Sequence, residues 1–233
     1  ETLIRARETI AKNLNCLPSE LTFTSGGSES ITQAILSAAA WGKSINKTHI
    51  ITSCFEHPAV LNSLKQLEKE GFTVDYVKIN NNGVIEANQI EKLINDNTFF
   101  VSIMYANNEI GTIQPIENIG CICRKKGILF HTDAVQAVAH IDIDVNRENI
   151  DMLSFSAHKF HGPKGIGVLY CRKEFPLTSI IYGGSQQRGK RGGTENVALI
   201  DAMANAFSNE INNLKTNTEK ILNLREKLEL KLL

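Results

Sequence analysis

The feature that most constrains the fold of this chain is a regular alternation of two kinds of segment. Apolar runs of roughly four to six residues alternate with amphipathic stretches of roughly ten to fifteen, a pattern typical of repeated βα units. The expected strands are 21–24, 48–53, 73–78, 98–104, 127–131, 151–155 and 166–171. The alternation predicts an α/β fold of three layers, α/β/α, around a mostly parallel, mixed central sheet of about seven strands.

Helical spacing appears between the expected strands. Apolar residues recur at helical positions in 31–39 and in 60–67, and Gly71 is placed to end the second helix. A further helical pattern runs from about Glu195 to the last residue without a terminating signal, and the chain does not begin with Met. We therefore expect residues 1–233 to be an incomplete domain of a longer protein, with 195–233 as one long helix leading out of it.

The composition is that of an ordinary globular domain. Of the 233 residues, 42% are hydrophobic, which is enough for one large core. Lys and Arg total 25 and Asp and Glu total 25, so the bulk charge does not favour nucleic acid or an anionic membrane surface as a partner. No apolar run approaches the ~20 residues that span a bilayer, and the first residues do not resemble a signal peptide. A cytoplasmic protein is expected.

The five cysteines are odd in number and scattered, which favours reduced thiols over a disulfide framework. Cys121 and Cys123 are closely spaced, but they fall within a helical pattern. Residues two apart on a helix point to different faces, so no metal site is predicted.

Polar residues follow the expected strands at the positions where ligands bind in open α/β sheets. Ser25–Ser30 follows the first strand. Its glycines and the next helix N-terminus could hold a phosphate, or could serve only the turn and the cap. His57 follows the second strand, just before a proline that suits a first helical turn. Its imidazole could stack on a planar ring and move protons, or could simply cap the helix.

Three more turns add to this set. Residues 105–112, after the fourth strand, are rich in Asn, which is also common in ordinary turns. Asp133 and Gln136 follow the fifth strand, where the acid could cap a helix or keep a heterocyclic nitrogen protonated. Ser156–Lys159 follows the sixth strand, and its lysine could be a Schiff-base amine or belong to a basic surface loop.

The five turns together favour one chemistry. A glycine-rich anion site, a ring-stacking imidazole, amide groups, an acid and an amine at one sheet edge are the parts that pyridoxal 5'-phosphate (PLP) chemistry requires. The sequence therefore predicts PLP as the cofactor.

The segments that carry this prediction resemble those of one family. In order and spacing they are similar to the NifS/IscS cysteine desulfurases of the class V aminotransferase superfamily, which have the fold type I PLP architecture. The matching segments are Ser25–Ser30, Glu56–His57, Asn107–Gly111, His131–Gln136, Ser156–Lys159 and Arg188–Thr194. The resemblance implies a homodimer that converts L-cysteine to L-alanine and passes the sulfur, as an enzyme cysteine persulfide, to an iron–sulfur scaffold or another sulfur acceptor protein.

The resemblance also implies roles for individual residues. Lys159 would form the internal aldimine, His57 would stack on the ring, and both would assist proton transfer. Asp133 would pair with the pyridine nitrogen and Gln136 with the ring hydroxyl. The other implied cofactor contacts are Gly27, Ser28, Ser156 and His158 to the phosphate, Asn108 to the cofactor or the substrate carboxylate, and Thr194 to the phosphate of the partner subunit's cofactor.

In this family the cysteine that accepts the sulfur lies on a mobile loop. None of Cys16, Cys54, Cys121, Cys123 and Cys171 occupies its position. The resemblance puts that loop, the arginine that binds the substrate carboxylate and a smaller domain beyond residue 233, and a short N-terminal stretch before residue 1. We therefore expect this chain alone to do no more than bind PLP and dimerise. Two alternatives stay open: a related selenocysteine or cyst(e)ine lyase, and a non-catalytic truncated module that binds PLP or dimerises.

Overall fold

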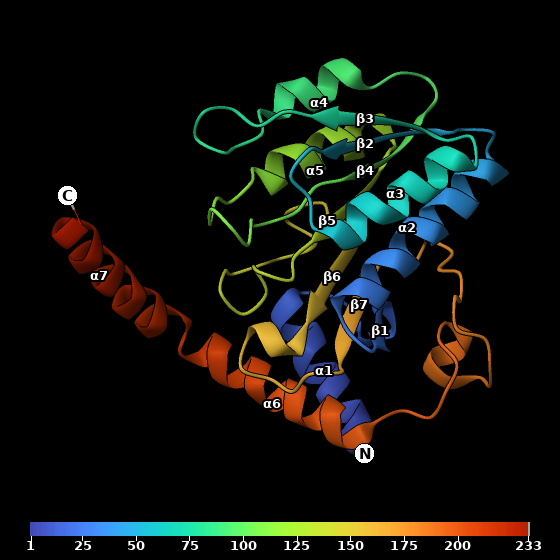
Figure 1. The fold of residues 1–233 in the computed structure, drawn as a ribbon. Coiled ribbons are helices and arrows are strands. Elements are labelled where there is room, and N and C mark those ends of the chain that lie inside the picture. The colour runs from blue at the N-terminus through green and yellow to red at the C-terminus, as the bar shows by residue number, and fades with distance from the viewer. Residues whose placement is uncertain (233) are drawn as a thin grey trace.

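The computed structural model describes residues 1–232 and contains a seven-stranded sheet (Figure 1). Its strands are β1 (Leu21–Thr24), β2 (His49–Ser53), β3 (Thr73–Val77), β4 (Thr98–Ser102), β5 (Leu129–Asp133), β6 (Met152–Ser156) and β7 (Gly167–Cys171). They lie in the order β1-β7-β6-β5-β4-β2-β3. All seven strands expected from the apolar runs are confirmed, and β5 extends far enough to include Asp133 as its last residue.

The sheet is mixed, as predicted. Strands β3, β2, β4, β5 and β6 pair in parallel, whereas β7 is antiparallel to both β6 and β1. A parallel connection needs a crossover of about a dozen residues or more, usually with a helix. The segment from β6 to β7 contains only a 3₁₀ turn and a loop, so it can return only in the antiparallel direction.

Helices cover both faces of the sheet. Helices α2 (Gly27–Ser44) and α3 (Pro58–Lys69) pack in one hydrophobic cluster. The opposite cluster holds α1 (Thr2–Leu14), α4 (Ala87–Leu93), α5 (Ile116–Lys126) and α6 (Val197–Asn212). Successive strand residues alternate between the two clusters; Ile50 packs with α2 and α3, for example, and Ile51 with the other layer. This confirms the predicted three layers.

The C-terminal helical segment differs from the single long helix that was expected. Helix α6 ends at Asn212 and a separate helix, α7 (Leu214–Leu232), follows. The side-chain Nδ2 of Asn213 donates to the carbonyl oxygen of Asn209 (2.8 Å), a local bond of the kind that makes Asn a poor residue for a helix interior. Packing against the rest of the chain ends at the same point. Helix α6 buries Met203 and Phe207, whereas α7 buries no residue.

Helix α7 extends away from the sheet and the other helices, as the red helix of Figure 1 shows. Several of its apolar side chains are exposed, among them Leu224, Leu228 and Leu230. Charged residues alternate with them, and no helix within residues 1–232 is long and apolar enough to cross a membrane.

Gly167, the first residue of β7, allows the loop after β1 to approach the sheet closely. A Cβ atom added at Gly167 would lie 2.7 Å from the Cα of Gly26 and 2.7 Å from the carbonyl oxygen of Phe155. Both neighbours are backbone, which cannot move aside as a flexible side chain can. The position of the Gly26–Gly27 turn therefore depends on the absence of a side chain at Gly167.

We predict that Gly167→Ala lowers the free energy of unfolding by about 1–3 kcal/mol, the usual cost of overpacking. Urea denaturation followed by circular dichroism measures this difference. An unchanged transition midpoint would contradict the close packing described here.

Candidate active site

A cavity of about 290 Å³ opens at the carboxyl ends of the strands. Of the ten site residues predicted from the sequence, the structure brings nine together in its lining. These nine are Gly27, Ser28, His57, Asn108, Asp133, Gln136, Ser156, His158 and Lys159. The tenth, Thr194, lies outside this cavity.

One wall of the cavity is suited to an anion. Helix α2 begins at Gly27, so the first N–H groups of a long helix and the hydroxyl of Ser28 meet there. Gly27 has no room for a side chain, because an added Cβ would lie 2.8 Å from Val135 Cγ2. Across the wall, Ser156 Oγ is 2.9 Å from Nδ1 of His158. The helix N–H groups and the two serine hydroxyls thus line one cavity, where they can donate to a phosphate group.

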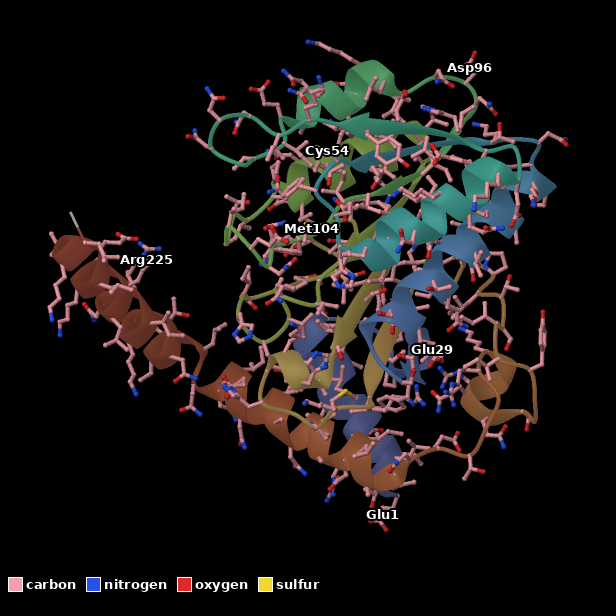
Figure 2. All side chains as sticks on the ribbon, in the orientation of Figure 1. Glu1, Glu29, Cys54, Asp96, Met104 and Arg225 are labelled. Atoms are coloured by element: carbon pink, nitrogen blue, oxygen red, sulfur yellow. The ribbon has the colours of Figure 1, made fainter. Side chains whose placement is uncertain are left out.

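Glu29 lies in the first turn of α2, as Figure 2 shows, close to this anion site. Arg191 neutralises it, with Nε 2.9 Å from Glu29 Oε1. Burial alone would raise the pKa of Glu29, but its hydrogen bonds to Arg191 and Ser25 outweigh burial and lower it. The carboxylate charge is therefore paired away from the cavity and does not repel an anion bound there.

Asp133 brings a buried carboxyl group to the cavity floor. It is 4% exposed, and its Oδ1 accepts a hydrogen bond from the backbone N–H of Val135 (3.0 Å). Burial raises its pKa; the Val135 N–H and the positive charge of Lys159 oppose that rise. A cationic N–H placed against Asp133 would complete the pairing.

Hydrogen bonds fix the backbone around Lys159, and the side chain of Lys159 lines the cavity. It ends a 3₁₀ turn, Ala157–Lys159, that follows β6 directly. The N–H of Gly162 donates to the carbonyl of Ala157 (2.9 Å), and Nε2 of His140 lies 2.9 Å from the carbonyl oxygen of Lys159. The amine thus projects from a fixed turn into the same space as Asp133.

His57 has a structural contact as well as a place in the cavity. It is the N-cap of α3, and its Nδ1 accepts a hydrogen bond from the backbone N–H of Ala59 (3.1 Å). Because Nδ1 is an acceptor, the neutral ring carries its proton on Nε2. The capping alternative left open by the sequence is therefore correct, and it coexists with a ring that faces the cavity.

The two adjacent asparagines after β4, Asn107 and Asn108, have different roles. Asn107 is buried, and its Oδ1 accepts hydrogen bonds from the backbone N–H groups of Glu109 and Ile110. Asn108 is exposed and lines the cavity. The turn-forming role and the ligand-facing role thus fall on adjacent residues.

Several cavity residues were not singled out from the sequence. Ile31, Met104, Ala106 and Val135 contribute apolar or backbone surface to the lining. Met104 is labelled in Figure 2 near the middle of the molecule. Apolar residues in strands and helices carry no chemical signal of their own, and only their position near a strand end or at the start of a helix could have indicated them.

Thr194 is exposed and lines a second, smaller cavity of about 100 Å³ with Ser25, Arg191 and Gly193. The loop that carries it is tied to the N-terminal part of the chain. Gln187 Oε1 accepts hydrogen bonds from Arg7 Nη2 (2.8 Å) and from the backbone N–H of Phe23 (3.0 Å).

All five cysteines are free thiols. Within residues 1–232, none lines the main cavity. Cys54 is exposed in the turn after β2 (Figure 2), whereas Cys123 and Cys171 are buried in the two cores.

The sheet order and the groups at its carboxyl edge define the class of protein. A mixed seven-stranded α/β/α sheet that carries an amine, a carboxyl group and an anion site at one edge is the fold type I architecture of PLP-dependent enzymes.

The Aminotransferase class-V family matches residues 1–232, and the chain belongs to this family. Cysteine desulfurase IscS of Clostridium botulinum is 48% identical over 223 residues, and a cysteine desulfurase of Nostoc sp. is 46% identical over 228 residues. These alignments cover 96% and 98% of this chain but 56% of each relative, so the chain spans little more than half the length of those proteins.

Solved structures agree. A NifS-like protein superposes with a TM-score of 0.96 at 43% identity, covering 99% of this chain and 64% of that one. A structure of SspA in complex with cysteine gives a TM-score of 0.86 at 45% identity, over 95% of this chain and 65% of that one. The fold and the resemblance to the NifS and IscS proteins are thereby confirmed.

The two roles of His57 can be separated by substitution. We predict that His57→Ala lowers the free energy of unfolding by about 1 kcal/mol through loss of the helix cap, whereas His57→Asn retains the cap and keeps wild-type stability. Urea denaturation of both variants provides the measurement. Equal stability of the two variants would show that the Ala59 hydrogen bond contributes nothing.

Proposed function

We propose that the protein to which this chain belongs is a PLP-dependent cysteine desulfurase. It would convert L-cysteine to L-alanine and pass the sulfur to an enzyme cysteine as a persulfide, for iron–sulfur cluster or other sulfur-compound assembly. The observation that carries the proposal is the meeting of Lys159, Asp133 and the α2 N-terminus in one cavity. The names of the relatives, and the SspA structure with cysteine, support cysteine as the substrate.

The donor set of the cavity fits PLP. An amine can condense with an aldehyde, and a buried carboxyl group can pair with a protonated ring nitrogen. A helix N-terminus with two hydroxyls can bind a phosphate. Val135 and the ring of His57 both line the cavity and offer apolar and planar surface to a flat heterocycle. When bound, PLP supplies an electron sink that stabilises negative charge at the substrate carbon.

The chain's own residues would divide the work by position. Lys159 would accept and return the substrate proton, and the Nε2–H of His57 would assist on the cavity side that its capped ring faces. Asp133 would hold the proton of the ring nitrogen. The remaining contacts would be Gly27, Ser28, Ser156 and His158 to the phosphate, Gln136 to the ring hydroxyl, and Asn108 to the cofactor or the substrate carboxylate.

The same proposal includes a homodimer and a sulfur acceptor protein. Thr194 is exposed and outside the cavity of its own chain, which supports a contact with the phosphate of a partner subunit's cofactor. The five free thiols support a reducing, cytoplasmic compartment.

A lyase that releases sulfur or selenium from a cysteine analogue is the second candidate. No cysteine of residues 1–232 lines the cavity, so the described residues are compatible with this candidate as well. A desulfurase needs a thiol from another segment at this point, whereas a lyase does not. A non-catalytic module that binds PLP or dimerises would retain the cavity without turnover.

Lys159 should be the site of covalent cofactor attachment. We predict that incubation with PLP and reduction with borohydride adds one cofactor mass to the wild type and to Lys164→Ala, but none to Lys159→Ala. Lys164 lies in the same loop and does not line the cavity, so it controls for general lysine reactivity. Peptide mass spectrometry locates the adduct, and attachment at another lysine would refute the assignment.

Residues 1–233 alone should bind PLP without completing the reaction. We predict no sulfide release from L-cysteine above the level of Lys159→Ala, because no thiol of the described chain lies in the cavity. A methylene blue sulfide assay measures the product. Clear turnover that depends on Lys159 would favour the lyase instead.

A further inference from the structure

Glu56 is a buried acid in the turn between β2 and α3, directly before His57. Its side chain is 4% exposed and does not line the cavity. It lies behind the wall to which His57 and Met104 belong, because it bonds to the backbone of Met104. The burial of this carboxyl group requires an explanation, because an ionised acid is costly to bury.

One oxygen of Glu56 connects two strand exits of the site. Oε1 lies 2.5 Å from Oγ of Ser53, the last residue of β2, and 2.9 Å from the backbone nitrogen of Met104, which follows β4. The chain beyond Ser53 leads to His57, and the chain beyond Met104 leads to Asn108. The two bonds therefore fix the spacing between the turns that carry these cavity residues.

Among the described residues, the second oxygen of Glu56 has no hydrogen-bond donor that would stabilise a negative charge on it. Oε2 is buried and has no hydrogen-bond partner within residues 1–232. In the ionised state it would be an unpaired charged oxygen in the protein interior, whereas a proton on it removes the charge.

A second buried acid, Asp133, lies near Glu56, and the neighbours of each carboxyl group determine which of the two keeps a proton. Two carboxyl groups that share one site do not both ionise readily. The positive charge of Lys159 near Asp133 favours its ionised form, although burial keeps the pKa of Asp133 above its ordinary value. Burial, and also the charge of Asp133, raise the pKa of Glu56 to about 8, although its bonds to Ser53 and Met104 oppose the rise.

We propose that Glu56 is a positioning residue, held as a neutral carboxylic acid, that fixes the exits of β2 and β4 behind the cavity and leaves the negative charge of the cavity on Asp133. An ionised Glu56 would favour protonation of Asp133, which would then lose the charge that holds a proton on a ring nitrogen. This consequence for Asp133 rests on the proposed function. The protonation state of Glu56 does not.

Infrared spectroscopy of the full-length, PLP-free protein tests the protonation state. At neutral pH, the difference spectrum between the wild type and Glu56→Gln should show the loss of a protonated carboxylic acid carbonyl band. Asp151→Asn is the matched control, because Asp151 is equally buried (2% exposed) but is paired with Arg124 and Arg172. Its spectrum should lose carboxylate bands. Loss of carboxylate bands in Glu56→Gln would overturn the proposal.

The pH dependence of stability gives a second test without cofactor. The folded pKa of about 8 lies above the ordinary 4.5, so the folded state binds a proton that the unfolded state has released between these values. Measured relative to Glu56→Gln, the free energy of unfolding of the wild type should fall as the pH rises from about 4.5 to about 8. A difference that stays level, or rises, would contradict a neutral Glu56.

The positioning role is tested by cofactor affinity. Glu56→Gln can still accept both hydrogen bonds and should bind PLP within about twofold of the wild type, with an unchanged pH titration of the cofactor absorbance. Glu56→Leu keeps the volume but leaves the Met104 N–H and the Ser53 hydroxyl without their acceptor. Its dissociation constant should rise about tenfold.

These outcomes separate the two proposals. Wild-type affinity in Glu56→Leu, or a shifted titration in Glu56→Gln, would overturn the role of Glu56 while PLP binding itself stands. Should Glu56→Leu fail to fold, the affinity and titration of Glu56→Gln still decide. If the wild type takes up no PLP, the proposed function and the positioning role both fail, and the infrared and stability results still settle the state of Glu56.

Discussion

The parallel alignment of β2, β4, β5 and β6 is the constraint on which the rest of the structure depends. Each of these strands ends at the same edge of the sheet, so the turns that follow them must meet there. The backbone hydrogen bonds of the sheet thus bring His57, Asn108, Asp133 and Lys159 together, although they are widely separated in sequence. The antiparallel β7 continues the sheet to β1 and lets the Gly26–Gly27 turn approach this edge.

Charge is distributed across the site by burial and by pairing. Glu29, in the first turn of α2, is neutralised by Arg191, and the buried acid Asp133 lies near the positive charge of Lys159. Within residues 1–232, Oε2 of Glu56 has no hydrogen-bond partner. Buried acids with different neighbours ionise differently, so the charge of the site depends on which carboxyl group keeps its proton.

Much of the precision of the site comes from residues that do not face it. The α3 backbone donates a hydrogen bond to Nδ1 of His57. Asn107 orders the turn that presents Asn108, and His140 contacts the backbone of Lys159. These contacts fix the backbone from which the cavity side chains project, so less backbone freedom is lost on ligand binding. The chemical residues and their supports are often neighbours in sequence.

The sequence by itself determined the layers and the seven strands, because apolar period is a local property, and the resemblance of its segments to the NifS/IscS family indicated nine of the cavity residues. It could not determine the break at Asn213, where a side-chain hydrogen bond and the loss of packing act together. Nor could it distinguish Asn107 from Asn108, or reveal the unpaired oxygen of Glu56. Only the tertiary structure decided these points, because burial and pairing depend on which distant segments are brought into contact.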